Sequence, residues 1–341
     1  MSSIGSSRVG GPSGPEPHED APAPAAAPGA APVPASAPAA RAGALPDRNA
    51  VVAALGATGL LKAPGASLPE VLFQSPEATV EHGTDPGDFY CEHIFFTAQR
   101  EAARAASSVV KNAAGEKLVG FLHVPPDDWT GGGGAKYAQA DRHRATREVV
   151  GAALRGYFQD AAAAVRTDPV KVLLTGYGPF ESVVDNPTGD FVSHTANIDA
   201  ALKAAFGADL KTPVGRPVAL PHGARALAYK VVDPATGRVR TLEVGLDRFA
   251  VADATLDPKS ARSIERAVAD FKPHAILSMG VAGPGAYLAE HHADDGGMRA
   301  AGGGFKHVDG APEEHAFADN YSLARAILRG GANEAGAAGA T

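Results

Sequence analysis

The sequence predicts an α/β fold in which a mostly parallel central sheet is covered by helices on both faces. Short apolar runs rich in β-branched residues, such as the run that begins "VKVLLTG" at Val170, alternate with longer segments of helical spacing. Several of these runs end in glycine or proline, as buried strands do where they enter loops. At 341 residues and 45% hydrophobic content, the chain is long enough to bury a large core.

The elements follow in order along the chain. Helices are expected at 45–61 and 88–106, then a strand at 117–126 that two prolines stop. A helix at 146–165 and a buried strand at 170–176 come next. One helical stripe joins Val149, Val150, Ala153, Leu154, Tyr157, Phe158 and Ala161.

The second half of the chain adds two further units. Residues 227–246 contain two β-rich runs around "DPATG", which predicts a hairpin inserted into the α/β core. Residues 260–280 predict a helix, a turn at Pro273 and another buried strand.

The two ends of the chain differ in composition from the rest. Residues 1–43 are mostly Ala, Pro, Gly and Ser, too poor in large apolar side chains to offset the entropy of ordering, so we expect a disordered tail. Residues 330–341 are expected to form a flexible C-terminal tail. A single domain is therefore expected at 44–329.

Composition excludes several classes of partner and compartment. The net charge of −7 and a pI near 5.9 give no basic stripe for nucleic acid or anionic lipid. No apolar stretch approaches the roughly 20 residues of a membrane span. The N-terminus has no apolar segment typical of a secretory signal, and the one cysteine excludes internal disulfides. These observations predict a cytoplasmic protein, and they leave its oligomeric state open.

Three residues could carry nucleophilic chemistry. Cys91 lies at the start of a predicted helix, where unpaired N–H groups and the helix dipole favour a thiolate, although a free cysteine can also be a buried structural residue. His123 ends a predicted strand and could act as the base, or bond only to a turn carbonyl. Glu290 follows a glycine-rich turn and could orient an imidazole, or be a solvated loop acid.

A metal site is a rival interpretation of the region after Glu290. His291, His292, Asp294 and Asp295 have suitable donor atoms, but adjacent histidines on a strand point to opposite faces and no His-x-x-x-His spacing is present. The glycine-rich turns match neither a dinucleotide-binding nor a P-loop motif. No metal and no cofactor is therefore expected.

Four motifs together resemble the type I pyroglutamyl peptidases, also called pyrrolidone carboxyl peptidases. "TGYGPFESVVDNP" is similar to the first strand and the G-F-x-P-F-G-G loop of this family, with Tyr177 and Phe180 at its aromatic positions and Asn186 before the proline. "PGDFYCE" is similar to the A-G-x-F-x-C-N motif of the nucleophile and supplies Phe89 and Cys91.

The remaining two motifs supply the other members of a catalytic triad. "FLHVP" resembles the family's F-I-H-V-P and supplies His123, and "GVAGPGAYLAEHHA" resembles the turn before the family's glutamate and supplies Glu290. The family order is first strand, glutamate, cysteine, histidine and final helix. Here cysteine and histidine precede the first strand, so the resemblance implies a circular permutation in which Arg166 to Pro169 join the family's last helix to its first strand.

The resemblance implies a three-layer α/β/α fold of the phosphorylase/hydrolase-like type and a cysteine omega-peptidase that removes an N-terminal pyroglutamyl residue from peptides. Cys91 would attack, His123 would transfer protons and Glu290 would orient His123. Tyr177, Phe180 and Phe89 would enclose the flat lactam ring, with Asn186 and Arg299 as further substrate-binding residues.

This sequence departs from the family around the pocket. Glu181 and Ser182 replace a Gly-Gly pair, Glu92 replaces the Asn after the nucleophile, and Val281 replaces a Gln. Arg299 matches the family's arginine only across a gap. Two alternatives therefore stay open: a non-enzymatic relative that acts as a binding protein, and a cysteine amidase of different specificity.

Overall fold

The computed structural model describes residues 68–75, 78–83, 90–126, 139–179, 186–257, 259–281, 287–293, 298–299, 305–306 and 318–331. The tail predicted at 1–43 and the helix predicted at 45–61 lie outside these residues. The described residues belong to one unit, Leu45–Thr341.

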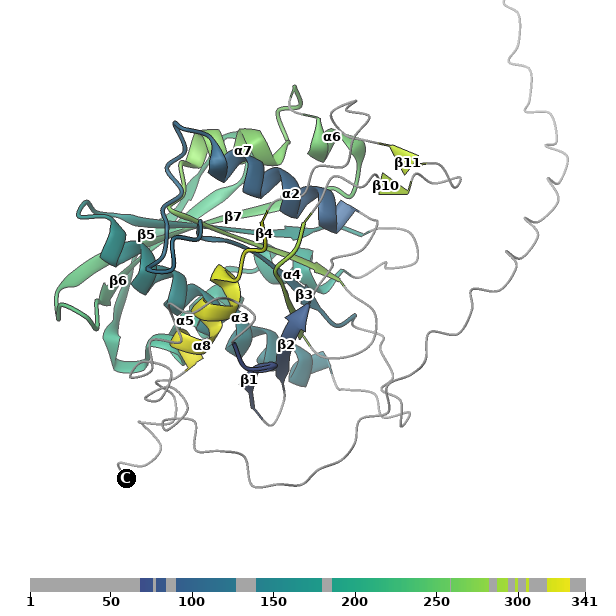
Figure 1. Cartoon of the computed structure of the whole chain (residues 1–341). Coiled ribbons are helices and arrows are strands. Elements are labelled where there is room, and N and C mark those ends of the chain that lie inside the picture. The colour runs from purple at the N-terminus through teal and green to yellow at the C-terminus, as the bar shows by residue number, and fades with distance from the viewer. Residues whose placement is uncertain are drawn as a thin grey trace, which may run out of the picture. The chain divides into compact units, whose positions relative to one another are not determined.

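A nine-stranded sheet forms the centre of the described part of the chain, in the order β1-β2-β9-β3-β8-β4-β7-β6-β5 (Figure 1). Its strands are β1 Val71–Gln74, β2 Thr79–Gly83, β3 Val119–Val124, β4 Val170–Tyr177, β5 Leu210–Ala219, β6 Arg225–Val232, β7 Val239–Phe249, β8 Ala275–Val281 and β9 Tyr287–Glu290. A separate two-stranded sheet pairs β10 Met298–Arg299 with β11 Phe305–Lys306.

Strand direction divides the large sheet into a centre and two margins. The four adjacent strands β3, β8, β4 and β7 are parallel to one another. On one side β6 and β5 continue antiparallel, and on the other side β9 runs antiparallel to β3 and parallel to β2. The parallel centre is buried on both faces, as such sheets require. The molecule is therefore an α/β protein with a mixed sheet.

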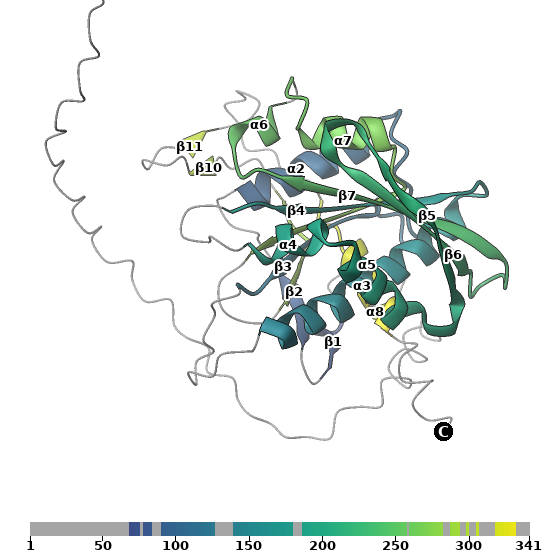
Figure 2. The ribbon, with the colours of Figure 1, turned by 180° about the vertical axis from the view of Figure 1, so that it is seen from behind.

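Helices lie on both faces of this sheet (Figures 1 and 2). The helices are α2 Tyr90–Ala103, α3 Gln139–Ala164, α4 Pro187–Ser193, α5 Thr195–Phe206, α6 Asp253–Leu256, α7 Ile264–Phe271 and α8 Ser322–Gly331. In both views α2, α6 and α7 cover one face, and α3, α5 and α8 cover the other. Short 3-10 turns at Gly207–Asp209 and Pro221–Gly223 flank β5.

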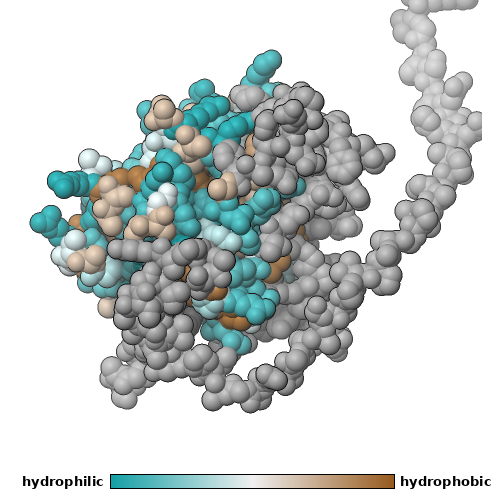
Figure 3. Space-filling view, in the orientation of Figure 1, coloured by the Kyte–Doolittle hydropathy of each residue, from teal (hydrophilic) through white to brown (hydrophobic). Residues whose placement is uncertain are grey.

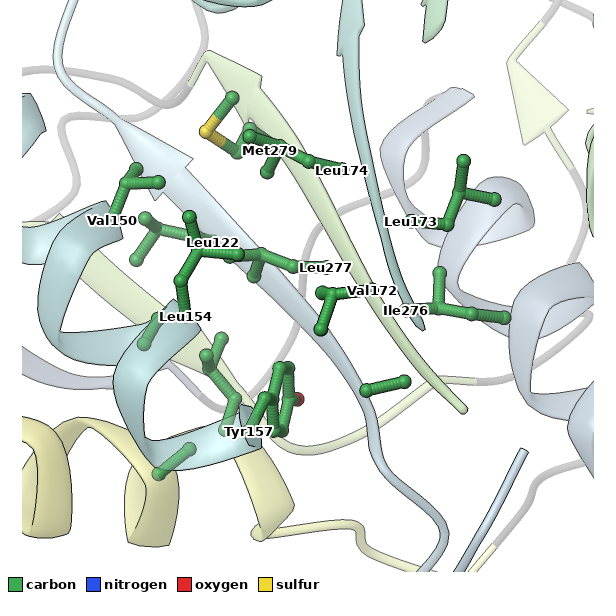
Figure 4. Packing of buried hydrophobic residues seen from close by; sticks show 14 of the residues in the cluster. Leu122, Val150, Leu154, Tyr157, Val172, Leu173, Leu174, Ile276, Leu277 and Met279 are labelled. Carbon is green, nitrogen blue, oxygen red and sulfur yellow. The ribbon is translucent and has the colours of Figure 1, made fainter. Parts of the chain in front are cut away.

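Side chains alternate between these two faces along the central strands. Figure 4 shows Leu122 and Leu277 on the side of α3, near its Val150 and Leu154, whereas Leu173 and Ile276 point to the opposite side. All of these side chains are buried. Because strand side chains alternate, the residues two positions after Leu173 and Ile276 also face the α2 side.

Most elements predicted from periodicity are present, and several bounds differ. The expected helices at 88–106 and 146–165 are α2 and α3, and α3 begins seven residues earlier than expected. The expected strands are β3, β4 and β8. Helix α8 ends at Gly331, two residues into the segment expected to be a tail.

The predicted hairpin exists as β6 and β7, but it is not an addition to a complete core. Strand β7 pairs in parallel with β4 from Leu242 to Phe249 and is a member of the buried centre. Strands β1, β2, β5 and β9 were not expected from the sequence pattern.

The surface seen in Figure 3 is mainly hydrophilic over the described residues, with smaller hydrophobic areas between. The exposed large hydrophobic residues of the described part are Val71, Val218 and Val239. Within those same residues, none of the helices combines the length and the apolar character that spanning a membrane requires.

Candidate active site

The register of the sheet brings the candidate triad to one place on the face that α2 covers. His123, near the end of β3, pairs with Gly280 of β8 on one side, and Phe121 pairs with Glu290 of β9 on the other. Paired residues in a sheet point to the same face. Two segments that are far apart in the chain therefore place an imidazole and a carboxylate on neighbouring strands.

His123 and Glu290 form a short, buried hydrogen bond. The distance from His123 Nδ1 to Glu290 Oε1 is 2.6 Å, and the two residues are 5% and 1% exposed. A carboxylate on Nδ1 fixes the orientation of the ring and leaves Nε2 for another partner. The Phe121 ring packs edge-on against the His123 ring at 5.1 Å and limits its movement further.

A glycine makes room for the Glu290 carboxylate. Gly83, at the end of β2, pairs with Glu290 across the sheet. A Cβ atom at position 83 would lie 2.0 Å from Glu290 Oε2, so no other residue fits there without moving the carboxylate. Within the described residues, Oε2 accepts no hydrogen bond. The carboxylate is thus positioned by close packing and by its bond to His123.

Cys91 reaches the same place from the helix. It is the second residue of α2, and its side chain is partly exposed. Its Sγ atom lies over Gly280, because a Cβ atom on that glycine would be 2.7 Å from the sulfur. The Cys91 side chain hydrogen-bonds to the His123 side chain. A continuous chain of contacts therefore runs from Cys91 through His123 to Glu290.

The electrostatics of His123 favour the imidazolium. Burial acts to lower the pKa of His123, but the hydrogen bonds to Cys91 and Glu290 and the charges of both partners raise it to about 9. An imidazolium between a sulfur and a carboxylate matches the thiolate–imidazolium pair of a cysteine nucleophile. The site can therefore attack a carbonyl and protonate a leaving group.

The structure describes only some of the other residues that were predicted to line the pocket. Tyr177 is the last residue of β4, is buried, and packs against Phe249 with ring centres 6.2 Å apart. Phe89 and Phe180 lie outside the described residues. Arg299 is in β10, and its side chain is not among the described ones.

Asn186 has a structural role in the described structure. Its Oδ1 accepts hydrogen bonds from the Thr188 N–H and hydroxyl at 3.1 and 2.8 Å, which caps α4. Its Nδ2 donates to the Gly178 carbonyl oxygen at 3.1 Å. The expectation of substrate contact therefore has a structural alternative: Asn186 ties the residue that follows β4 to the start of α4.

Polar residues not expected from the sequence lie beside Cys91 on the same face of the sheet. Thr175 of β4 and Ser278 of β8 pair across the sheet, and Thr175 Oγ1 donates to Ser278 Oγ at 3.0 Å. Asp247 of β7 pairs with Thr175 on its other side and is also buried. A sequence signal was present for Thr175 and Ser278, because each directly follows a run of buried apolar residues in its strand. No such signal marks Asp247, because β7 also contains Arg240, Thr241 and Glu243.

The pKa of Asp247 is strongly perturbed. Burial raises it to about 7, against the opposing effects of the Arg248 N–H and the Arg262 charge. A buried carboxyl group with a pKa near neutral, on the sheet face that also carries a candidate nucleophile, is typical of functional sites. Its charge state affects the neighbouring side chains on this face of the sheet.

The two described histidines that were considered for a metal contact other residues instead. His292 Nδ1 lies 3.0 Å from Asp319 Oδ1, and the rings of His291 and Tyr321 stack at 4.4 Å. Asp294 and Asp295 lie outside the described residues. Among the described side chains, no group of three or more His, Cys, Asp or Glu residues is arranged to hold a metal ion.

Neither models of protein families, nor curated proteins, nor solved structures gave a match to this chain.

Proposed function

We propose that this chain is a cysteine omega-peptidase that hydrolyses an N-terminal pyroglutamyl residue from peptides. The observation that carries the proposal is the contact chain from Cys91 through His123 to Glu290, with Nδ1 of the imidazole 2.6 Å from the carboxylate. This arrangement supports acyl transfer to sulfur. The pyroglutamyl specificity rests on the resemblance of the four sequence motifs to type I pyroglutamyl peptidases.

The proposed reaction has two steps. The Cys91 sulfur attacks the carbonyl carbon that follows the lactam ring, the C–N bond to the next residue breaks, and the protonated His123 gives its proton to the leaving amine. Water then attacks the thioester, His123 takes a proton from that water, and pyroglutamate leaves as Cys91 is regenerated. Glu290 holds the imidazole in both steps and stabilises its positive charge whenever His123 is protonated.

The start of α2 offers a place for the oxyanion. The first N–H groups of a helix have no partner within the helix, and Cys91 is the second residue of α2. Backbone N–H groups near the nucleophile are suitable donors to the tetrahedral intermediate. Tyr177 would supply one aromatic wall for the lactam ring.

The proposal includes the layer architecture of the domain and the order of its elements along the chain. We infer a three-layer α/β/α domain of the phosphorylase/hydrolase-like type, circularly permuted relative to the type I pyroglutamyl peptidases. In support of this inference, α3 ends at Ala164 and the central strand β4 begins at Val170 after a short connection. The triad residues then occur in the order expected for a permuted chain.

A fluorogenic pyroglutamyl-coumarin amide tests the function directly. We expect turnover by the full chain and a loss of at least ~10³-fold in Cys91→Ala, because removing a triad nucleophile costs that much or more. The exposed His194 provides a matched control for a His123→Ala variant, since His194→Ala should leave turnover unchanged.

Two other outcomes separate the alternatives. Rapid alkylation of Cys91 at neutral pH without turnover of the pyroglutamyl amide, together with turnover in a panel of other aminoacyl-coumarin amides, would identify a cysteine amidase of different specificity. No rapid alkylation and no turnover of any amide would leave a binding protein that retains the fold.

A further inference from the structure

The hydroxyl group of Tyr177 is a polar group of the site that the proposed reaction does not yet use. Tyr177 is 3% exposed, so its hydroxyl is removed from bulk water. Within the described part of the chain, the hydroxyl oxygen has no hydrogen-bond partner of good geometry. Buried tyrosine hydroxyls normally have a partner, which directs attention to the groups beside it.

The sheet register places Tyr177 next to the sulfur of Cys91. Strands β4 and β8 are parallel, and their pairing ends with Thr175 and Ser278. Two residues further along each strand, Tyr177 and Gly280 face the same side of the sheet as this pair. The hydrogen bond between the Thr175 and Ser278 hydroxyls shows that these two side chains lie on the same face of the sheet. Cys91 Sγ lies over Gly280. Gly280 is therefore paired with His123 of β3 on one side, has the end of β4 with Tyr177 on its other side, and has the sulfur above it.

The electrostatics around the phenol agree with this placement. Burial raises the pKa of Tyr177 well above its ordinary value, and the charge on Cys91 raises it next, followed by that of Asp247. The Thr175 and Ser278 hydroxyls, which hydrogen-bond to each other and lie at poor hydrogen-bond geometry to the phenol, act in the opposite direction. The phenol therefore keeps its proton at neutral pH and can donate a hydrogen bond.

The charges near the sulfur explain why a further donor would matter. Glu92 follows Cys91 directly and is buried, and Asp247 lies on the same face of the sheet as Tyr177. Ionised carboxylates in this region disfavour a further negative charge on the sulfur. An imidazolium offsets part of this effect, and a neutral O–H donor adds stabilisation without adding charge.

We propose that the Tyr177 hydroxyl donates a hydrogen bond to the thiolate form of Cys91, from the side opposite His123, and is a catalytic residue of this site. The proposal rests on the proposed nucleophilic role of Cys91 and deepens it. It assigns the thiolate two donors, an imidazolium N–H and a phenol O–H. It also gives a reason for a tyrosine at a position where the resemblance implies a phenylalanine.

Alkylation of Cys91 by iodoacetamide tests this hydrogen bond without any substrate. Cys91 is the one cysteine of the chain, so mass spectrometry of the full-length protein reports its modification alone. We expect Tyr177→Phe to raise the pH at which the alkylation rate is half-maximal by about one unit. Below that pH, alkylation should be about tenfold slower than in wild type, because a hydrogen bond to a charged group stabilises it by at least this much. Tyr229→Phe is the matched control, because Tyr229 donates to Asp199 instead.

A second variant guards against a change in packing. Replacement of Tyr177 by 3-fluorotyrosine keeps the ring and strengthens the O–H donor, so the midpoint should move downward. Opposite shifts in the two variants would support the hydrogen bond. Rate profiles that coincide with wild type in both folded variants would overturn it.

Turnover is measured separately on the same proteins. If Tyr177→Phe alkylates with the same pH profile as wild type while wild type turns over the pyroglutamyl amide, the role of Tyr177 is refuted and the proposed function stands. A Tyr177-dependent shift without pyroglutamyl turnover would support the hydrogen bond and refute the assigned substrate.

Discussion

Glu290 Oε1 lies 2.6 Å from Nδ1 of His123, although 167 positions separate the two residues in the chain. Both side chains are buried, and the contact forms because β9 runs antiparallel to β3 at the margin of the parallel centre. The pair therefore depends on a strand whose direction opposes that of its neighbour. Its energetic consequences can be measured without knowledge of the substrate.

The first prediction concerns the titration of His123. Its ring protons should titrate near pH 9 in NMR spectra of the wild-type protein, because hydrogen bonds to Cys91 and Glu290 outweigh burial. In Glu290→Gln the measured pKa should fall, since the charge and the acceptor on Nδ1 are both weakened. Glu81→Gln, on the neighbouring strand β2, is the control and should leave the titration unchanged. A wild-type titration at or below pH 6.5 would contradict the ion pair.

The second prediction tests the space under the carboxylate. Gly83→Ala would place a Cβ atom 2.0 Å from Glu290 Oε2, so the carboxylate must move. We expect a loss of about 1–3 kcal/mol in the free energy of unfolding, as in other overpacked cores. We also expect a lower pKa for His123, by NMR, than in wild type. Gly178→Ala is a stability control, because its nearest neighbour would be at an ordinary 3.6 Å. An unchanged titration in Gly83→Ala would show that Glu290 tolerates displacement.

The local parts of this site could be predicted from the sequence. The position of Cys91 at a helix start follows from the residues around it, and α2 does begin at Tyr90. The position of His123 near the end of a buried strand follows from an apolar run that two prolines stop, and β3 does end at Val124. Periodicity and breakers are properties of neighbouring residues, so they are visible in the chain itself.

The register could not be predicted in the same way. Gly83 and Gly280 are placed by pairings between distant strands, and no local pattern distinguishes them from turn glycines. Strand β7 was expected to be part of an added hairpin, because two β-rich runs flank the turn sequence "DPATG". In the structure β4 covers the edge of β7, and Asp247 becomes a buried residue of the centre.

The third prediction tests the position of the Cys91 sulfur over Gly280. Gly280→Ala would place a Cβ atom 2.7 Å from Cys91 Sγ and 2.7 Å from the Phe121 ring. The ring is held in the core, so the sulfur and the start of α2 are the parts that can shift. We expect alkylation of Cys91 by iodoacetamide to slow at least about tenfold at neutral pH, because the donors to the thiolate are lost. Alkylation at the wild-type rate in a folded Gly280→Ala protein would contradict the placement of the sulfur over this glycine.

The fourth prediction concerns the buried carboxyl of Asp247 and the stability of the fold. Burial raises the pKa of Asp247 from 3.8 to about 7, so the native state holds a proton that the unfolded state has lost over this interval. The contribution of this group to the free energy of unfolding is full below about pH 4. It falls by up to about 1.4 kcal/mol per pH unit as the pH rises through the interval.

Denaturant unfolding of Asp247→Asn between pH 4 and 7 checks this sign. The variant should lack most of the fall that wild type shows, and its advantage over wild type should grow toward pH 7. The exposed Glu70 supplies the control, since Glu70→Gln should follow the wild-type curve. The pKa of His123, raised to about 9, contributes stability that is full below pH 6.5 and is lost as the pH rises through 9, so its effect lies mainly above this interval. Parallel curves for wild type and Asp247→Asn would mean that Asp247 is ionised in the native state at ordinary pH, and the sheet face that carries Cys91 would then hold a fixed negative charge.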